Sequence, residues 1–329
     1  MPDPILIASF LGGLVLLFVG GDLLVRGAVR AGRAMGASPL IAGIFIVALG
    51  TSLPEIFVSV NAAFSGSPGL AIGNIVGSSI ANVFLVLAIP ALIFPMTAGG
   101  PGQGRALFAM LLATVLWIGM TALMPLTPLM GLCFLFVLIG YTGLSLFAAA
   151  RDEVAGKPTG VREHATSGPP LWLALILVPL GAAALVYASG LIVEGADGLA
   201  RHFNMPEEYI GLTLLAVGTS LPEIGASLAA AFQKRGDVLV GNILGSNTIN
   251  ILGAGGIVAM SGPVEIARLF QTYDHWIMGF SALVLAVLIV TRARIGRLLA
   301  LLLMLIYAAY IYGLVNGVNL QALFETVRG

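Results

Sequence analysis

Long apolar stretches separated by short polar or turn-forming breaks make up most of this chain. A membrane-spanning helix needs about 20 mostly apolar residues. By that criterion the pattern predicts ten spans, at about 4–25, 38–64, 70–94, 105–124, 128–150, 170–194, 206–232, 238–261, 274–292 and 296–316. Turn-forming breaks such as Ser65–Gly69 and Gly99–Gly102 separate them. The pattern therefore predicts an all-α polytopic membrane protein.

Composition supports this class. Of the 329 residues, 59% are hydrophobic and only 9% are charged, whereas a soluble domain carries about 25% charged residues. The formal net charge is zero, so no nucleic-acid partner is expected. The single cysteine, Cys133, excludes an internal disulfide, and its apolar surroundings suggest a small apolar filler.

An internal duplication organises the chain. Residues 50–84 recur at 218–252, an offset of 168, and about half of the paired positions are identical. Each half then holds five predicted spans, 1–150 and 170–329, joined by a polar linker at 151–169. Because five is odd, the second half must enter the membrane from the opposite side. Inverted repeats of this kind are typical of transporters that bind substrate near the bilayer midplane.

Orientation follows from the basic residues. Lys and Arg concentrate in cytoplasmic loops, and twelve of the 15 fall on one side of the predicted topology. We therefore expect a multi-pass protein of the cell membrane with both termini outside and the 151–169 linker inside.

The repeated phrase Gly50-Thr51-Ser52-Leu53-Pro54-Glu55 interrupts an apolar span, and it recurs at 218–223. Pro54 cannot donate a helical hydrogen bond. The helix is therefore expected to end near Gly50 and to resume near Leu53. Ser52 and Glu55 fit a capping box, and the break is expected to leave backbone carbonyls near Ala48 unpaired.

Buried carboxylates give this break its functional interest. A charge at the bilayer centre costs about 2.5–3.5 kcal/mol on insertion scales. A lone Glu55 is explained by helix capping, but Glu223 in the matching phrase suggests a shared site. In the next span Asn74, Ser78 and Asn82 lie along one helical face, and the same set recurs 168 residues later.

Every candidate ligand in these stretches is an oxygen. Without His or Cys, the set suits Na⁺, Ca²⁺, Mg²⁺ or Mn²⁺ and not Zn, Cu or iron. Two carboxylates balance one divalent ion, and a flexible cage of six to eight oxygens suits Ca²⁺.

The paired G-T-S-L-P-E and G-N-x-x-G-S-x-x-x-N stretches resemble the alpha-repeats of the cation/calcium exchanger superfamily, in particular compact prokaryotic sodium/calcium exchangers. The resemblance implies ten helices in two inverted repeats, with helices 2, 3, 7 and 8 broken around a midplane ion site. It implies Na⁺/Ca²⁺ antiport by alternating access, with no enzymatic activity and no cofactor. The expected partners are the lipid bilayer and the transported Na⁺ and Ca²⁺, with no nucleic acid and function as a monomer.

The resemblance also implies the ligands of that site. They are the carboxylates of Glu55 and Glu223, the side-chain oxygens of Thr51, Ser52, Ser78, Asn82, Thr219, Ser220, Ser246 and Asn250, and the backbone carbonyls of Ala48 and Ala216. Potassium-dependent relatives carry Asp at the last position of one repeat. Both Asn82 and Asn250 are amides here, which argues against a potassium requirement.

Three other functions are weighed against Na⁺/Ca²⁺ exchange. A proton-coupled Ca²⁺ or Mn²⁺ exchanger of the same fold would use Glu55 or Glu223 as proton acceptor. An intramembrane hydrolase is disfavoured because neither H-E-x-x-H nor G-x-S-x-G occurs. A passive channel is disfavoured because inverted repeats with broken helices favour alternating access.

Overall fold

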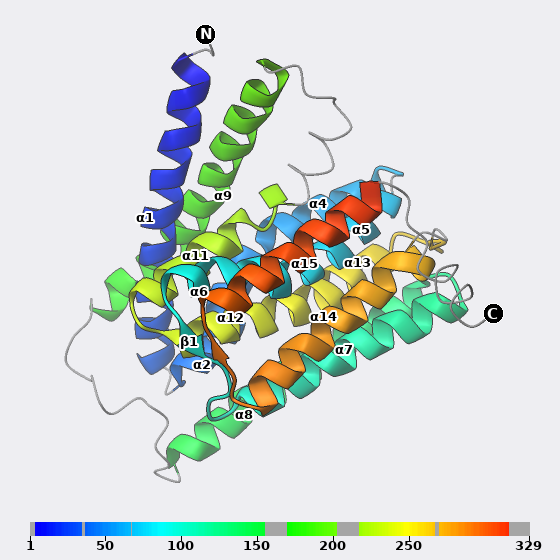
Figure 1. Cartoon of the computed structure of the whole chain (residues 1–329). Coiled ribbons are helices and arrows are strands. Elements are labelled where there is room, and N and C mark those ends of the chain that lie inside the picture. Colours follow the sequence, from blue (N-terminus) through cyan, green and yellow to red (C-terminus); the bar gives the residue numbers. More distant parts are fainter. Residues whose placement is uncertain are drawn as a thin grey trace.

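The computed structural model describes residues 4–34, 37–66, 68–154, 170–202, 217–266 and 270–315. Within these ranges the chain is helical apart from short connections and two antiparallel two-residue strands, β1 (Met96–Thr97) and β2 (Arg294–Ile295). Seven of the described helices are long and apolar enough to cross a membrane, or eight if one bent pair counts as a single span. The chain is therefore an all-α integral membrane protein (Figure 1).

The first half supplies helices over each of its predicted spans. They are α1 (Pro4–Ala34), α2 (Pro39–Ala42), the π-helical turn η1 (Gly43–Val47), α3 (Ala48–Thr51), α4 (Leu53–Phe64), α5 (Pro68–Ala81), the π-helical turn η2 (Asn82–Val86), α6 (Ala88–Ile93), α7 (Gln103–Leu123) and α8 (Pro128–Val154). The predicted linker 151–169 begins inside α8, and residues 155–169 lie outside the described ranges. The boundaries of the two halves stay predictions.

The second half follows the same order. Its described elements are α9 (Leu171–His202), α11 (Leu221–Phe232), α12 (Gly236–Thr248), the π-helical turn η4 (Ile249–Ala254), α13 (Gly255–Ala259), the π-helical turn η5 (Phe270–Asp274), α14 (His275–Val290) and α15 (Arg297–Val315). The predicted span 206–232 is described only from residue 217, so the candidate ligand Ala216 lies outside the described residues.

The helices separate into a buried centre and an outer pair. In the most apolar window of Pro68–Ile93, 83% of the residues are buried, against 22% in α1. The centre formed by α4, α5, α11 and α12 is flanked by α7, α8, α14 and α15, while α1 and α9 pack side by side (Figure 1). The two helices approach closely, since a Cβ added at Gly20 would lie only 3.0 Å from the Ala184 Cβ. Small residues of this kind let membrane helices approach closely.

The predicted interruptions are of two kinds. The span 38–64 is broken as predicted, because α4 turns by 46° from the preceding helix at Ser52. The spans 70–94 and 238–261 were expected to be broken too, but there the structure differs. Both continue through the π-helical turns η2 and η4. One extra residue per turn is accommodated without losing the backbone hydrogen bonds, which hydrocarbon surroundings make costly to break.

Candidate ion site

Both copies of the repeated phrase adopt the same local backbone. Ser52 has φ −82° and ψ 2°, and Ser220 has φ −84° and ψ 2°. A proline is the second residue of the helix that follows in each copy. Since proline has no N–H, the carbonyl of Gly50 cannot receive its usual bond from residue 54. The proline therefore accounts for the break at Ser52, as predicted.

The expected capping box does not form. The Ser52 side chain caps no backbone N–H of α4. Its hydroxyl instead donates a 3.0 Å hydrogen bond to Oε1 of Glu223, in the opposite half of the chain. The Ser52 N–H, which Glu55 would have capped, donates to the Ala48 carbonyl at 2.9 Å. With that donor taken, the Glu55 carboxylate stays available for the interior of the protein.

The Ala48 carbonyl is not unpaired, contrary to expectation. It accepts a 2.9 Å hydrogen bond from the Ser52 N–H, and it shares the single hydroxyl hydrogen of Thr51, at 3.3 Å, with Oδ1 of Asn242, which is equally distant. The helix therefore keeps its regular bond at this position, one residue before the break. A carbonyl oxygen has two lone pairs, and both of these donors compete with any cation for them.

The two carboxylates lie at the centre of the molecule. Glu55 and Glu223 are each 1% exposed and are close enough to interact electrostatically. Glu223 Oε1 accepts from Ser52 and, at 3.5 Å, from the Ser246 hydroxyl. Two helices of one half and one segment of the other thus meet at this single oxygen.

Two asparagines hold the halves together in pseudo-symmetric fashion. The Asn74 amide donates to Ser59 at 2.9 Å and to the Glu55 carbonyl at 3.1 Å, while its oxygen accepts from Thr219 at 3.3 Å. The Asn242 amide donates to Ser227 at 3.1 Å, and its oxygen accepts from Thr51 at 3.3 Å. Each asparagine therefore fixes a threonine of the opposite repeat beside the break.

Several buried polar atoms of the candidate ligands have no hydrogen-bond partner within the described part of the chain. They are both oxygens of Glu55, Oε2 of Glu223, the Ser220 hydroxyl, Oδ1 of Asn82, and both amide atoms of Asn250. Leaving a buried polar group unsatisfied costs about 1–3 kcal/mol, and more for a charged group. A cluster of orphaned oxygens with two carboxylates is a favourable place for a cation.

The site is not a cluster of charged metal ligands. Among the described residues no group of three or more His, Cys, Asp and Glu could hold a metal ion. All eleven described candidate ligands are nevertheless buried, namely Ala48, Thr51, Ser52, Glu55, Ser78, Asn82, Thr219, Ser220, Glu223, Ser246 and Asn250. A cation here would depend on hydroxyl, amide and carbonyl oxygens around only two charges. Their roles as ligands stay a prediction.

Sequence reasoning missed Asn247. Its oxygen accepts a 2.9 Å bond from the Asn82 amide, and its own amide donates to the Ser79 carbonyl at 3.2 Å. The bond fixes the Asn82 amide nitrogen, and Oδ1 is left without a partner among the described groups. The counterpart of Asn247 is Ser79, whose hydroxyl bonds within the described part of the chain to the Ile75 carbonyl of its own helix. The replacement of a hydroxyl by an amide, directly after the matched Ser78 and Ser246, was the available signal.

The π-helical turns lie at the same point of both repeats. η2 begins at Asn82, and η4 includes Asn250, 168 residues later. Such turns inside α-helices are frequent at functional sites. Here they coincide with the last candidate ligand in each repeat.

Comparison with known proteins places this arrangement in a family. Residues 5–147 and 173–316 match the model of the sodium/calcium exchanger protein family. CaxA of Alkalimonas amylolytica is 35% identical, over 91% of this chain and 95% of that protein. The sodium/calcium exchanger MaX1 of Methanosarcina acetivorans is 30% identical over the same shares of the two chains.

Solved structures agree. A structure of the sodium-calcium exchanger NCX_Mj, soaked with Na⁺ and Ca²⁺, aligns with a TM-score of 0.78 at 29% identity, over 94% of this chain and 99% of that one. The predicted resemblance is thus confirmed for both halves. The chain belongs to the sodium/calcium exchanger family of the cation/calcium exchanger superfamily, and it is a membrane transporter and not an enzyme.

Proposed function

We propose that this protein exchanges Na⁺ for Ca²⁺ across the cell membrane by alternating access. The observation that carries the proposal is the pair Glu55 and Glu223. One comes from each repeat, and three of their four carboxylate oxygens have no partner among the described residues. Two carboxylates neutralise one Ca²⁺, and the same oxygens accommodate Na⁺ when Ca²⁺ leaves. Competition for one set of ligands is the physical basis of exchange.

The ligand set extends from these carboxylates to the surrounding oxygens. We assign to it the hydroxyls of Thr51, Ser52, Ser78, Thr219, Ser220 and Ser246, the side-chain oxygens of Asn82 and Asn250, and the carbonyls of Ala48 and Ala216. The Ala48 carbonyl joins only if it gives up the bond from Thr51. Sodium as the coupling ion is supported by MaX1 and NCX_Mj, which are described as sodium/calcium exchangers.

Alternating access would come from the outer pair, α1 and α9. This pair is less buried than the centre, and its contact with α11 involves backbone, because a Cβ at Gly21 would meet the Gly225 carbonyl. Glycines at such a contact let the two backbones approach closely, with no side chains interlocked between them. We propose that the pair slides past the centre and exposes the site first to one side of the membrane and then to the other.

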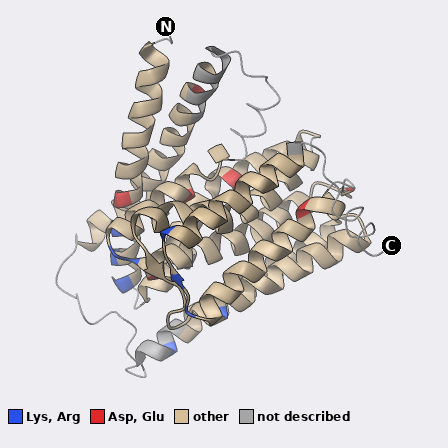
Figure 2. Cartoon of the chain, viewed as in Figure 1, with Lys and Arg blue, Asp and Glu red and all other residues tan. Residues whose placement is uncertain are grey.

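We further propose ten spans in two inverted repeats, a monomeric functional unit, and both termini outside. Lys and Arg gather at the end of the molecule where α1 ends and α7 begins (Figure 2), as expected for the cytoplasmic side. Cysteine labelling in intact cells tests the orientation, in a Cys133→Ala background because Cys133 is exposed. A cysteine at Gly329 should react and one at Ser167 should not; the reverse would invert the topology.

Proteoliposomes test the coupling ion. Loaded with Na⁺ and diluted into Na⁺-free medium with Ca²⁺ at equal pH on both sides, they should accumulate Ca²⁺. Vesicles with a pH gradient and no Na⁺ should not. The reverse result would identify the proton-coupled Ca²⁺ or Mn²⁺ exchanger. That second candidate is favoured by one observation, the two orphaned oxygens of Glu55, which are potential proton acceptors.

A further inference from the structure

The outer pair of helices contacts the two halves of the centre unequally. α1 packs on α11, where a Cβ at Gly225 would come within 2.8 Å of the Leu17 side chain. In the same contact the rings of Phe18 and Phe232 meet edge-on at 5.0 Å. The counterpart of Gly225 in the first repeat is Phe57, 168 residues earlier, and it is 78% exposed. The described part of α9 therefore does not cover α4 as α1 covers α11.

A hydrogen bond joins the outer pair to the centre at the covered contact. The Gln233 amide, at the C-terminal cap of α11, donates to Oδ1 of Asp22 on α1 at 2.9 Å. Arg26, one turn further along α1, holds the other carboxylate oxygen, with its Nε 2.7 Å from Oδ2. Asp22 is thus held by its own helix while it accepts a charge-assisted bond from the neighbouring helix.

This bond has no counterpart in the other repeat. Gly190 occupies on α9 the position that Asp22 occupies on α1, and Ser65 occupies the position of Gln233. Since Gly190 has no side chain, it cannot accept such a bond. The connection is therefore confined to one end of the interface. Asp22 lies in the second half of α1, toward the end of the molecule where Lys and Arg gather (Figure 2).

Sliding of the outer pair has to break this bond. When α1 moves along α11, the Gln233 amide and the Asp22 carboxylate separate beyond the roughly 3.5 Å limit of a hydrogen bond. No equivalent bond replaces it between α9 and α4, because Gly190 stands there. A two-state equilibrium shifts by the difference in interaction free energy between its states. The bond therefore favours the conformation in which α1 lies on α11.

We propose that Asp22 and Gln233 form a latch, which keeps the proposed cytoplasmic side of the ion site shut in the resting protein. The inference rests on the proposed sliding of α1 and α9. The Asp22 side chain is 27% exposed, so solvent weakens the bond, and we expect it to favour the latched conformation by about tenfold. Each transport cycle then includes the release of this latch, and Gln233 sets the balance between the two conformations.

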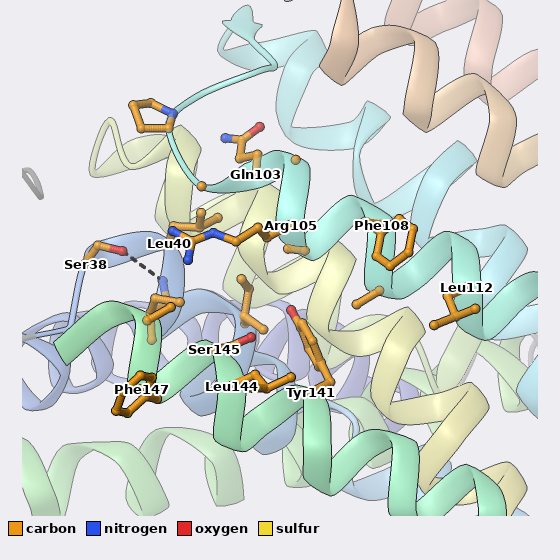
Figure 3. A pocket seen from close by; sticks show the side chains of 18 of the residues that line it. Ser38, Leu40, Gln103, Arg105, Phe108, Leu112, Tyr141, Leu144, Ser145 and Phe147 are labelled. Atoms are coloured by element: carbon orange, nitrogen blue, oxygen red, sulfur yellow. Dashed lines mark hydrogen bonds between the residues drawn. The ribbon is translucent and has the colours of Figure 1, made fainter. Parts of the chain in front are cut away.

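A matched pair of glutamine variants separates a latch from an ordinary stabilising bond. Gln233→Met keeps the length of the side chain and removes the donor. The control is Gln103→Met, because Gln103 accepts a bond of the same 2.9 Å length from the Gly99 N–H. Gln103 begins α7 and lines the pocket between α7 and α8 (Figure 3), so its bond does not cross the outer pair. Gln233→Lys keeps a donor and adds a charge opposite to that of Asp22, which should strengthen the latch.

Spin labels report the position of α1 directly. Ala34 at the end of α1 and Gly104 near the start of α7 are exposed, and a Cβ at Gly104 meets no described atom within 4 Å. A cysteine at each position can be labelled in the purified full-length protein, in a Cys133→Ala background because Cys133 is exposed. Electron paramagnetic resonance then measures the distances between the two labels with Na⁺, with Ca²⁺ and with neither.

We expect two distance populations, one for each position of the outer pair. Gln233→Met should shift their ratio by about tenfold away from the latched population. Gln103→Met should leave the ratio unchanged, although it loses a bond of the same kind, and Gln233→Lys should shift it toward the latched population.

Two outcomes would overturn the latch, and they differ in what they say of exchange. A ratio that responds to Na⁺ and Ca²⁺ but is the same in Gln233→Met and the parent would refute the latch and leave the sliding of the outer pair intact. A single distance population in every variant and every condition would refute the sliding itself, and with it the proposed mechanism of exchange.

Discussion

The two repeats present the same residues to the ion site but bond them differently. Glu223 accepts hydrogen bonds from Ser52 and Ser246. By symmetry Glu55 would accept from Ser220 and Ser78, yet neither of its oxygens has a partner among the described groups, and the Ser220 hydroxyl is also unpaired. A duplicated sequence therefore does not give two equivalent carboxylates. Glu223 is held by hydrogen bonds from Ser52 and Ser246, whereas both Glu55 oxygens have no partner among the described groups and are available to a bound ion.

Removing either charge should give the largest effect. We expect Glu55→Gln and Glu223→Gln each to lower Ca²⁺ uptake into proteoliposomes by about 100-fold or more, because one carboxylate cannot balance a divalent ion in a low-dielectric site. Glu265→Gln is the control, since it makes the same substitution at an exposed glutamate outside the candidate site. Near-normal uptake by either glutamine variant would remove that carboxylate from the mechanism.

The same variants sharpen the comparison when stability is measured without Ca²⁺. Glu55→Gln replaces a buried carboxyl group that has no partner among the described groups and removes its repulsion of Glu223, so it should raise the free energy of unfolding by about 1 kcal/mol or more. Glu223→Gln should gain less, because a Gln oxygen still accepts from Ser52 but loses the charge that strengthens that bond. Equal stabilisation would mean that the two carboxylates are equivalent after all.

The next difference is expected between Asn82 and Asn250, the last candidate ligand of each repeat. Asn250→Asp adds a carboxylate where both amide atoms are unpartnered among the described groups, so it should fold normally and change the dependence of transport on pH, Na⁺ and K⁺. Asn82→Asp removes the donor of the 2.9 Å bond to Asn247 and sets oxygen against oxygen, which should cost about 1–3 kcal/mol of stability. Ion profiles and thermal melts of both variants test this. An Asn250→Asp protein with the parent's ion and pH dependence would show that Asn250 does not reach the ion.

Asn247 is expected to act by positioning Asn82. Asn247→Ser makes repeat 2 match repeat 1 at this position and removes the acceptor for the Asn82 amide. We expect KM for Ca²⁺ to rise by about threefold to tenfold with little change in kcat, because the cost of one neutral hydrogen bond is about 0.5–1.5 kcal/mol. Asn247→Gln keeps the amide chemistry and should recover part of the affinity. An equal fall in kcat would indicate a general packing defect.

Sequence reasoning succeeded where the determinant was local. Pro54 fixes a break at Ser52 whatever its surroundings, and helical periodicity fixes which face carries Asn74 and Asn82. It failed where the partner lies in the other repeat. The capping rule predicted that Ser52 would bond to its own helix, but the nearby Glu223 carboxylate accepts its hydroxyl instead. The contact between Asn82 and Asn247, 165 residues apart, is equally invisible to local rules.

The two serines at the breaks are also expected to differ in their contribution to stability. Ser52→Ala deletes the 3.0 Å bond to the Glu223 carboxylate, and hydrogen bonds to charged groups contribute about 1.5–3 kcal/mol. Ser220→Ala deletes a hydroxyl that has no partner among the described residues, so it should leave the stability of the ion-free protein within about 0.5 kcal/mol of the parent.

Chemical or thermal unfolding in Ca²⁺-free buffer measures that difference. Repeating it with saturating Ca²⁺ distinguishes a hydroxyl that stabilises the ion-free protein from one that binds the ion. If both hydroxyls bind the ion, both variants lose part of the stabilisation that Ca²⁺ confers, whereas only Ser52→Ala is less stable without it. Thr51→Ser is a suitable control, because it keeps the hydroxyl that donates to Asn242. Equal loss of ion-free stability in the two alanine variants would show that Ser220 is bonded like Ser52, and the asymmetry between the repeats would then not exist at the breaks.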